Sequence, residues 1–430
     1  MKQVLLFFGL AANLTLWGLA TPLLTLGQIV PDQTLPVNSI VTPEGQTNMI
    51  TGGTAVNGTL FHSFEQFSVL TGHSAIFNNE AQIRNILTRI TGGTISEIDG
   101  LLRANGAANL FLLNPNGIVF GANARLDIGG SFFASTGSEF VFADGRTYSA
   151  TTPNAPPLIT VDVPLGVQFG PSPGAIVNRS QVAIPVDNQA LPVGLQVSPG
   201  QSLILLGGEV VLEGGLLTAP GGQIAIASMG ENAQVTLNPT PRGIVVGNDG
   251  GQRFQDIRLS GGAIASTSAA VGGDIQLQGR QVSVQDGSVI STASFGAGNA
   301  GNLTIAATES VEVIGNSSKL EFIENILLPA GGFDPAILRN GGLFALALGE
   351  GAAGNIVIET GEFRANNGAI VTTTTTGNGV GGNLLVNATN SVILNNAGLL
   401  TGTAGTQDAG NLEINTGTLN LVKDYKIQVN

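Results

Sequence analysis

A three-residue motif recurs at a fixed spacing in the second half of this chain. Glycine, then asparagine or aspartate, then isoleucine or leucine occur together five times, and successive copies lie 28, 53, 28 and 28 residues apart. A period of this size indicates a solenoid or a propeller, in which stacked units build a core that no single unit can bury alone. The five motifs begin at Gly273-Asp274, Gly301-Asn302, Gly354-Asn355, Gly382-Asn383 and Gly410-Asn411.

Each repeat contains three strand-like segments, which in one copy are residues 303–306, 310–313 and 343–347. Three strands in a turn of about 28 residues predict an all-β fold, a parallel β-helix whose alternate side chains point into a narrow core. Propeller blades need about 40 residues or more, so we prefer the β-helix. The mature chain would then make roughly 16 turns and a rod on the order of 75 Å long. Equivalent side chains would stack about 4.8 Å apart as a ladder of amides at Asp274, Asn302, Asn355, Asn383 and Asn411.

The single step of 53 residues is interpreted as one repeat that carries an insertion. Residues 310–313 resemble 281–284, and residues 342–354 resemble 287–301, so both ends of the step match one unit. The segment 314–340 between them is therefore predicted to be an excursion of about 25 residues from one corner of the β-helix.

Composition favours strands and turns and excludes several kinds of site. Lys, Glu and Arg are scarce, whereas Gly, Thr, Asn, Val and Ile are abundant. With no cysteine and two histidines, the chain cannot carry disulfides, cysteine-based zinc sites, thiol nucleophiles or a histidine-rich metal centre. A net charge of −13 disfavours nucleic acid. The G-x-G-x-x-G match at 296–301 precedes a strand-like run rather than a helix, so we expect no dinucleotide and no other cofactor.

The N-terminus predicts export from the cytosol. Lys2 precedes the uncharged segment 4–26, which is typical of a secretory signal peptide or a membrane anchor. Polar and small residues within this segment, Asn13 and Gly18 among them, favour the signal. We place the signal peptide at 1–27, with cleavage before Gln28, and cleavage after Ala20 is the alternative.

The stretch 108–137 contains four brief strand-like runs joined by tight corners. Its centre is Asn114-Pro115-Asn116-Gly117, which fits a type I turn because Asn, Pro and Gly occupy the first, second and fourth positions. The turn separates two apolar runs, 110–113 and 118–120, each predicted to be a strand buried on both faces. Many phenylalanines lie between Phe61 and Phe142. We interpret them as an aromatic core that plugs the N-terminal end of an elongated fold.

Three regions are predicted after the signal peptide. Residues 28–166 are dense in strand and turn signals, and 167–260 form a proline-rich transition that continues the β-helix. Residues 261–430 carry the 28-residue repeats, with the insertion near 315–340.

The N-terminal region carries six motifs in a fixed order. They are Asn38-Ser39-Ile40, Thr51-Gly52-Gly53-Thr54, Leu60-Phe61-His62-Ser63-Phe64, Ile76-Phe77-Asn78-Asn79, Arg89-Ile90-Thr91-Gly92-Gly93 and the stretch 108–137. With these motifs, the block 28–145 resembles the N-terminal secretion domain of filamentous-haemagglutinin-type exoproteins of the two-partner secretion pathway, in the variant found in cyanobacteria. The resemblance implies a right-handed parallel β-helix, export to the periplasm and recognition by a dedicated outer-membrane β-barrel transporter.

Within that resemblance, Asn114-Pro115-Asn116 coincides with the Asn-Pro-Asn motif that the family needs for secretion. The following residue is Gly117 rather than the leucine of the better-known haemagglutinins, and no Asn-Pro-His-Leu motif is present. Two hypotheses stay open for Asn114, Pro115, Asn116 and Gly117. The transporter recognises these four residues, or they form a rigid corner on which folding depends.

Some β-helices cleave polysaccharides, so an enzyme is the alternative function. Such an enzyme needs carboxylates beside a basic residue on one face. The histidines His62 and His73 are expected at the surface or at corners, rather than as a catalytic base or as metal ligands. A solvated surface cluster is the simpler explanation for the densest candidate group, which is Arg242, Asp249, Arg253, Asp256 and Arg258.

The sequence therefore predicts a non-enzymatic exoprotein that is secreted or displayed on the surface of a bacterium with an outer membrane. Family resemblance adds an adhesive role, with a host-surface or polysaccharide receptor. The strand-like run 425–430 shows no cap, which leaves a truncated member and an oligomer that covers the open edge as alternatives.

Overall fold

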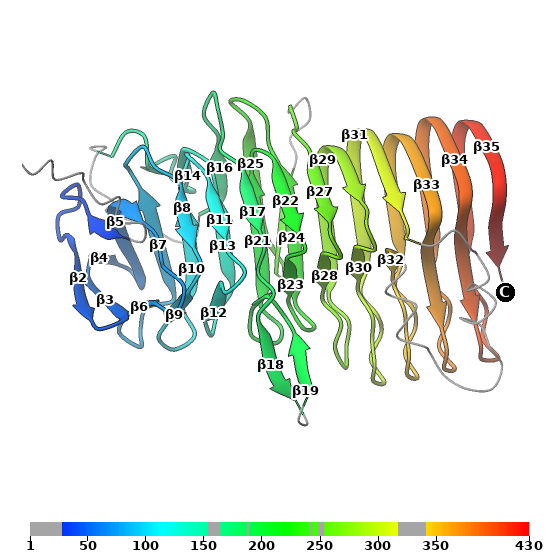
Figure 1. Ribbon diagram of the computed structural model, residues 1–430, viewed down its shortest axis with the longest axis horizontal. Helices are drawn as coiled ribbons and strands as arrows, with labels where there is room; N and C mark the ends of the chain where they lie inside the picture. The colour runs from blue at the N-terminus through cyan, green and yellow to red at the C-terminus, as the bar shows by residue number, and fades with distance from the viewer. Residues whose placement is uncertain are drawn as a thin grey trace, which may run out of the picture.

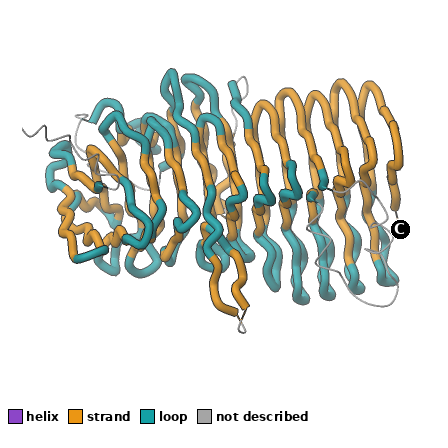
Figure 2. Tube along the Cα trace, in the orientation of Figure 1, coloured by secondary structure: helices purple, strands orange, loops and turns teal. Residues whose placement is uncertain are grey.

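The computed structural model describes residues 28–153, 164–186, 189–240, 243–247, 253–316 and 341–429. These residues form strands, turns and loops (Figure 2). No helix long and apolar enough to cross a bilayer occurs in these ranges. The predicted signal peptide at 1–27 and residues 317–340 of the predicted insertion lie outside the described residues.

The described chain winds into a parallel β-helix with three faces (Figure 1). Face one is a stack of parallel strands, one from each coil. These strands are β5 (Thr59–Phe67), β7 (Asn85–Ile90), β10 (Asn109–Leu113), β13 (Phe132–Ser135), β21 (Ser202–Gly207), β24 (Gln223–Ser228), β29 (Asp274–Val284), β31 (Leu303–Ile314), β33 (Ile356–Thr375), β34 (Leu384–Thr403) and β35 (Leu412–Val429).

Two further faces complete each coil. The long strands β29 and β31 turn a corner and continue into face two, and β33 to β35 run through all three faces. Face two otherwise consists of β8 (Ser96–Ile98), β11 (Ile118–Phe120), β17 (Ile176–Asn178), β22 (Val210–Glu213) and β27 (Ile257–Ser260). Face three contains β6 (Ser74–Phe77), β9 (Leu101–Ala104), β12 (Arg125–Asp127), β20 (Leu195–Gln196), β23 (Leu216–Thr218), β28 (Ile264–Ser266), β30 (Val289–Ser291) and β32 (Gly342–Phe344).

The rod is shorter than the sequence predicts. Within the described residues, face one has eleven strands rather than the roughly 16 turns expected. At about 4.8 Å between strands, the stack measures about 48 Å instead of the predicted 75 Å. The prediction was wrong because it assigned every residue to a coil, whereas many residues belong to a cap and to excursions from the corners.

The cap closes the N-terminal end of the β-helix. β1 (Ile29–Pro31) and β4 (Thr54–Val56) both pair antiparallel with β5. β2 (Ser39–Glu44) and β3 (Thr47–Gly52) form a hairpin, and β3 continues face three by pairing parallel with β6. Figure 1 shows these strands in blue at the end of the rod.

Two excursions leave the coils between residues 136 and 256. One is an antiparallel sheet of five strands, which we call the outer sheet, and the other is the hairpin of β18 (Ala183–Val186) and β19 (Gln189–Pro192), which projects from the rod in Figure 1. Proline-rich sequence accompanies both, consistent with corners rather than regular rungs. The outer sheet consists of β14 (Glu139–Val141), β15 (Thr147–Ser149), β16 (Gly166–Gln168), β25 (Gln234–Thr240) and β26 (Gly243–Gly247).

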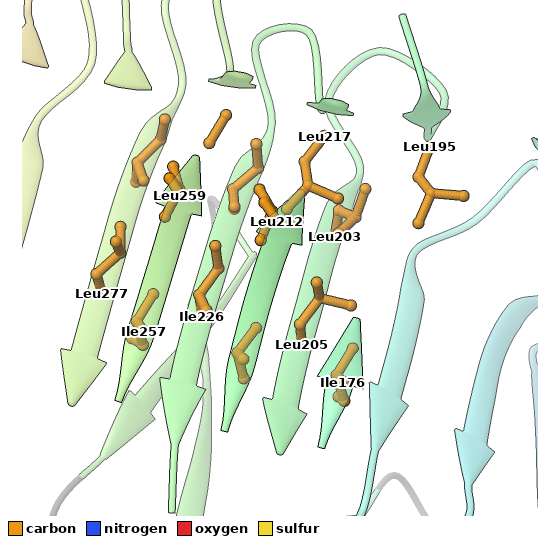
Figure 3. Close-up of a cluster of buried hydrophobic side chains, with 14 of the residues drawn as sticks. Ile176, Leu195, Leu203, Leu205, Leu212, Leu217, Ile226, Ile257, Leu259 and Leu277 are labelled. Carbon is orange, nitrogen blue, oxygen red and sulfur yellow. The ribbon is translucent and has the colours of Figure 1, made fainter. Parts of the chain in front are cut away.

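The β-helix encloses one continuous apolar core. Figure 3 shows part of it, with Leu203, Leu205, Ile226 and Leu277 among the side chains of successive rungs. This core runs from Ile29 in the cap to Leu399 on face three. The confirmed fold class is thus an all-β parallel β-helix, built as the repeat predicts.

The aromatic residues do not form one plug at the end of the rod, as the sequence analysis expected. Phe132 points into the β-helix, whereas its neighbour Phe133 points out and packs beneath the outer sheet against Phe140. Phe61 and Phe111 also belong to this second, outer core. Alternation along a strand sends successive side chains to opposite sides. Because face one is covered on both sides here, both sets of aromatics are buried.

Candidate functional site

The turn Asn114-Pro115-Asn116-Gly117 joins face one to face two at the end of β10. The backbone N–H of Gly117 donates to the carbonyl oxygen of Asn114 at 3.2 Å, which closes the turn. The Asn114 side chain is fully buried, and its Oδ1 accepts the backbone N–H of Asn116 at 3.0 Å. Its Nδ2 donates to the carbonyl oxygen of Thr94 at 3.1 Å and to Ser96 Oγ at 2.9 Å. Asn114 therefore fixes both its own turn and the corner of the preceding coil.

Asn116 differs from Asn114 in being exposed. Its Nδ2 donates to the carbonyl oxygen of Gly92 at 2.7 Å and to Asn114 Oδ1 at 3.1 Å. The carboxamide of Asn116 thus lies on the surface in a fixed orientation, held by the same preceding corner.

Gly117 is confined between the corners on either side of it. Its φ is +127°, a region that favours glycine. A Cβ at this position would lie 3.2 Å from the carbonyl oxygen of Ala175 and 3.3 Å from Ile95 Cγ2. On the following corner, the N–H of Gly174 donates to the carbonyl oxygen of Pro115 at 2.9 Å. A leucine at position 117 would be strained here, which gives a physical reason for glycine at this position.

Three uncharged residues with exposed or partly exposed side chains lie at this corner. Ile95 is 44% exposed beside Gly117. Asn116 is exposed and Pro115 is half-buried. We call Ile95, Pro115 and Asn116 the corner patch.

The residues of the predicted amide ladder lie on consecutive rungs at one corner, in register. In four of the five residues the side-chain oxygen accepts a backbone N–H of the next rung, with distances between 2.8 and 3.1 Å. The bonds run from Asn302 N to Asp274 Oδ1, from Asn355 N to Asn302 Oδ1, from Asn383 N to Asn355 Oδ1 and from Asn411 N to Asn383 Oδ1.

The same column continues toward the cap, which the sequence analysis missed. Asn109 Nδ2 donates to Asn85 Oδ1 at 2.9 Å, and the N–H of Ser131 donates to Asn109 Oδ1 at 2.8 Å. The N–H of Ser202 donates to Ser131 Oγ at 3.0 Å, and Gln223 is paired in register between Ser202 and Asp274. The available signal was a polar residue directly before the first inward-facing residue of each face-one strand. Excursions of unequal length hide the period there.

The glycine of each repeat motif is required by the close stacking of the corners. A Cβ at Gly301 would lie 1.9 Å from the carbonyl oxygen of Gly273, and one at Gly354 would lie 1.8 Å from that of Gly301. Such contacts are too short for any side chain, so backbone packing explains the motif. The G-x-G-x-x-G match at 296–301 is one of these corners and leads into β31.

The candidate catalytic cluster does not converge on one site in the described residues. Asp256 Oδ2 lies 2.7 Å from Arg280 Nη2, and Arg258 Nη2 lies 3.8 Å from Glu209 Oε1. Arg253 pairs with Glu231. Arg242 and Asp249 lie outside the described residues. No group of three or more His, Cys, Asp or Glu side chains that could hold a metal ion is found in the described ranges.

His62 is not at the surface, as the sequence analysis expected, but 1% exposed beneath the cap. Its Nδ1 lies 3.0 Å from Ser39 Oγ, and burial lowers the pKa of His62 to about 4. The prediction was wrong because His62 lies on β5, which is covered on both sides. His73 is half-buried at a corner, with its Nδ1 3.2 Å from the carbonyl oxygen of Thr71.

Comparisons with known proteins agree with this architecture. A family model described as "TPS secretion domain" matches residues 27–277, more than half of the chain. The crystal structure of the HMW1 secretion domain from Haemophilus influenzae is similar, with a TM-score of 0.51 and 16% identity over 92% of this chain and 100% of that chain. The crystal structure of the filamentous hemagglutinin secretion domain also matches, with a TM-score of 0.27 and 15% identity over 91% of this chain and 99% of that chain.

At such low identity, the likeness to the HMW1 structure concerns the fold alone. A search of curated proteins found no match. The comparisons do not support the narrower assignment to a cyanobacterial variant. Because the family model matches more than half of the chain, the chain belongs to the TPS secretion domain family, the secretion domains of two-partner secretion exoproteins.

Proposed function

We propose that an outer-membrane β-barrel transporter recognises this exoprotein at the corner patch. The proposal rests on the different positions of the two asparagines in Asn114-Pro115-Asn116-Gly117. Asn114 is buried and holds the turn, whereas Asn116 presents an oriented carboxamide beside the exposed Ile95. The two hypotheses for the motif then apply to different residues: Asn114 is structural, and Asn116 contacts the partner.

The three residues of the corner patch carry no charge, which limits the kinds of contact that they can make with the transporter. Recognition would depend on shape, on hydrogen bonds to Asn116 and on burial of the Ile95 and Pro115 side chains. Apolar burial contributes about 25 cal/mol per Å², so even a small patch gives a measurable change in affinity. Such contacts are insensitive to salt, unlike those of a charged surface.

We further propose that the domains divide the work. Residues 28–166 serve export, residues 167–260 continue the β-helix, and residues 261–430 extend a surface that binds a receptor outside the cell. The regular outer side of the repeat rungs supports an adhesive role, with a host-surface or polysaccharide receptor. Purified full chain with and without residues 261–430 would be compared for binding to whole cells and polysaccharide arrays, and equal binding by both would contradict this assignment.

The recognition proposal is tested by an export assay. The full chain is expressed with its candidate transporter, and extracellular protein is compared for wild type, Asn116→Ala, Ile95→Ser and a transporter deletion. We expect Asn116→Ala and Ile95→Ser each to reduce export about tenfold, because each removes a contact worth about 1.4 kcal/mol. Export should stop without the transporter.

Matched variants separate recognition from folding. Ile40→Ser changes an isoleucine on the cap that is 54% exposed, and it should leave export unchanged. Asn114→Ala should lower the melting temperature as well as export, whereas Asn116→Ala should affect export far more than protease resistance. Export that is independent of the transporter would refute the family assignment of function. Normal export of both Asn116→Ala and Ile95→Ser would refute recognition at the corner patch.

A further inference from the structure

Arg89 lies on β7 between the cap and the outer sheet and is only 3% exposed. Its Nε donates to Ser63 Oγ at 2.9 Å, and its Nη2 donates to Thr34 Oγ1 at 2.8 Å. On the other side, Nη1 donates to the carbonyl oxygen of Ser149 at 2.7 Å, and Nη2 donates to that of Pro153 at 3.0 Å. One guanidinium therefore binds residues on two sides. On one side is the segment 32–38 between β1 and β2, which we call the leading segment, and on the other are the end of β15 and the segment after it, as far as Pro153.

Two neighbours complete the surroundings of this buried cation. The Tyr148 ring lies beneath the guanidinium, with 4.4 Å between its centroid and Arg89 Cζ. The Tyr148 hydroxyl donates to the carbonyl oxygen of His62 at 2.7 Å, which ties β15 to β5 directly. Beyond the hydroxyls of Thr34 and Ser63 lies the Asp32 carboxylate, which accepts from them at 2.7 and 2.6 Å.

The partners of Arg89 are far apart in the sequence. Thr34 precedes Arg89 by 55 residues, and Ser149 and Pro153 follow it by 60 and 64. A buried cation that loses its hydrogen-bond partners is strongly destabilising. Burial of Arg89 is therefore favourable only when the leading segment and the segment after β15 are both in place.

We propose that Arg89 is a clasp that makes the cap and the outer sheet close as one cooperative unit. The cap then does not close stably until the chain as far as Pro153 has joined the fold. This inference concerns the folding of the chain itself and holds whatever the transporter contacts.

Hydrogen exchange of the purified full chain tests the clasp through Thr34→Val. This variant removes one hydroxyl from the leading segment and keeps the size of the side chain. We expect amide exchange to rise about tenfold or more at β15, on the far side of Arg89, as well as in β1, since hydrogen bonds to charged groups contribute about 1.5–3 kcal/mol. Exchange in β33 to β35 should not change.

Further variants identify the guanidinium as the link. Arg89→Met should raise exchange in β1 and β15 together, and Arg89→Lys should do the same because one ammonium cannot reach acceptors on both sides. Thr42→Val changes an exposed threonine on β2, and Arg280→Met changes a half-buried, ion-paired arginine on β29. Both variants are controls and should leave amide exchange at β15 unchanged.

Three results would overturn the proposal. Thr34→Val could raise exchange near β1 while leaving 147–153 as in wild type. Arg89→Lys could behave as wild type, which would mean that charge alone suffices. Exchange could also rise equally along the whole rod, which would mean that the chain has a single cooperative unit. If Arg89→Met does not fold, the response to Thr34→Val decides.

Discussion

Short carboxamide side chains join neighbouring coils at two kinds of corner. Asn114 satisfies two acceptors of the preceding coil. The side-chain oxygens of four further asparagines each accept a backbone N–H of the next rung, and these are Asn109, Asn302, Asn355 and Asn383. Asparagine suits both places because its amide donates and accepts at a distance that spans one rung. These bonds add to the backbone ladder and set the register between coils.

Buried His62 makes the secretion domain sensitive to acid. The pKa of His62 is lowered to about 4 in the fold, whereas it is about 6.5 in the unfolded chain. Stability from neutral His62 is fully present above about pH 6.5 and is lost as the pH falls toward 4, by up to about 3 kcal/mol. Amide exchange in β5, corrected for intrinsic rates, should rise over this interval, and His62→Gln should abolish the rise.

A companion variant and a separate pH window isolate this effect. His73→Gln changes a half-buried histidine at a corner and should keep the wild-type response. Burial raises the pKa of Asp32, but hydrogen bonds from Ser63, Thr91 and Thr34 outweigh it, so the net pKa is lowered. The contribution of Asp32 is therefore lost only below about pH 3.8. An unchanged exchange rate in β5 between pH 6.5 and 4 would show that His62 does not couple folding to protonation.

At the level of the element, strands were predictable where a continuous apolar run lies beside a turn, and corners where glycine is obligatory. The runs at 110–113 and 118–120 are strands, as predicted, because their apolar residues are continuous and a turn of known type separates them. The outer sheet was not predictable. β14 and β16 look like any other short strands, and only the apolar outer side of β13, with Phe133, calls for a cover. The need to cover the outer side of β13 arises from tertiary packing, so it leaves no periodic pattern in the sequence.

Glycine in the repeat motif is required by the next rung rather than by its own backbone angles. Gly354→Ala would place a Cβ 1.8 Å from the carbonyl oxygen of Gly301, so the two coils must separate locally. We expect a loss of about 1–3 kcal/mol or more, as for other overpacked sites. Gly93→Ala meets nothing within 4 Å and should change stability by less than about 1 kcal/mol. Urea denaturation followed by circular dichroism measures both, and equal midpoints would contradict the stacking argument.

At the scale of the whole molecule, the repeat was enough to predict the architecture, but the length of the rod was not predicted correctly from the sequence. The period of 28 residues predicted three strands per coil, and β33 to β35 have that form. The sequence predicted a turn at Asn114-Pro115-Asn116-Gly117. It did not predict the burial of Asn114, the hydrogen bonds of the turn to Gly92 and Thr94, or the exposure of Ile95. These features depend on which coil lies next to the turn, and a local motif does not encode that arrangement.

Removal of one complete repeat should leave a folded, shorter rod. Deletion of 384–411 joins Asn383 to Leu412, so that β35 takes the place of β34 with every face in register. Neighbouring repeats interact only with one another, so the remaining coils should keep their protection. Scattering should report a rod about 4.8 Å shorter.

Half a repeat gives the opposite expectation. Deletion of 384–397 joins Asn383 to Gly398, which brings face-three residues to face one and exposes their apolar side chains. Residues beyond the junction should become sensitive to protease. Equal protease resistance of the two deletion variants would mean that register between coils is not specified by the repeat.

The inter-strand bonds of every coil run along the rod, and this gives the molecule a mechanical direction. Tension along the axis is carried by all coil interfaces in series, so the weakest interface should separate first, whereas tension across the axis strains the bonds of an interface in shear. The first coil lies under the cap, while β35 has one hydrogen-bonded neighbour, β34, among the described strands. The coils of β31, β33 and β34 are each paired on both sides, so they should resist detachment under load better than a coil with one bonded neighbour.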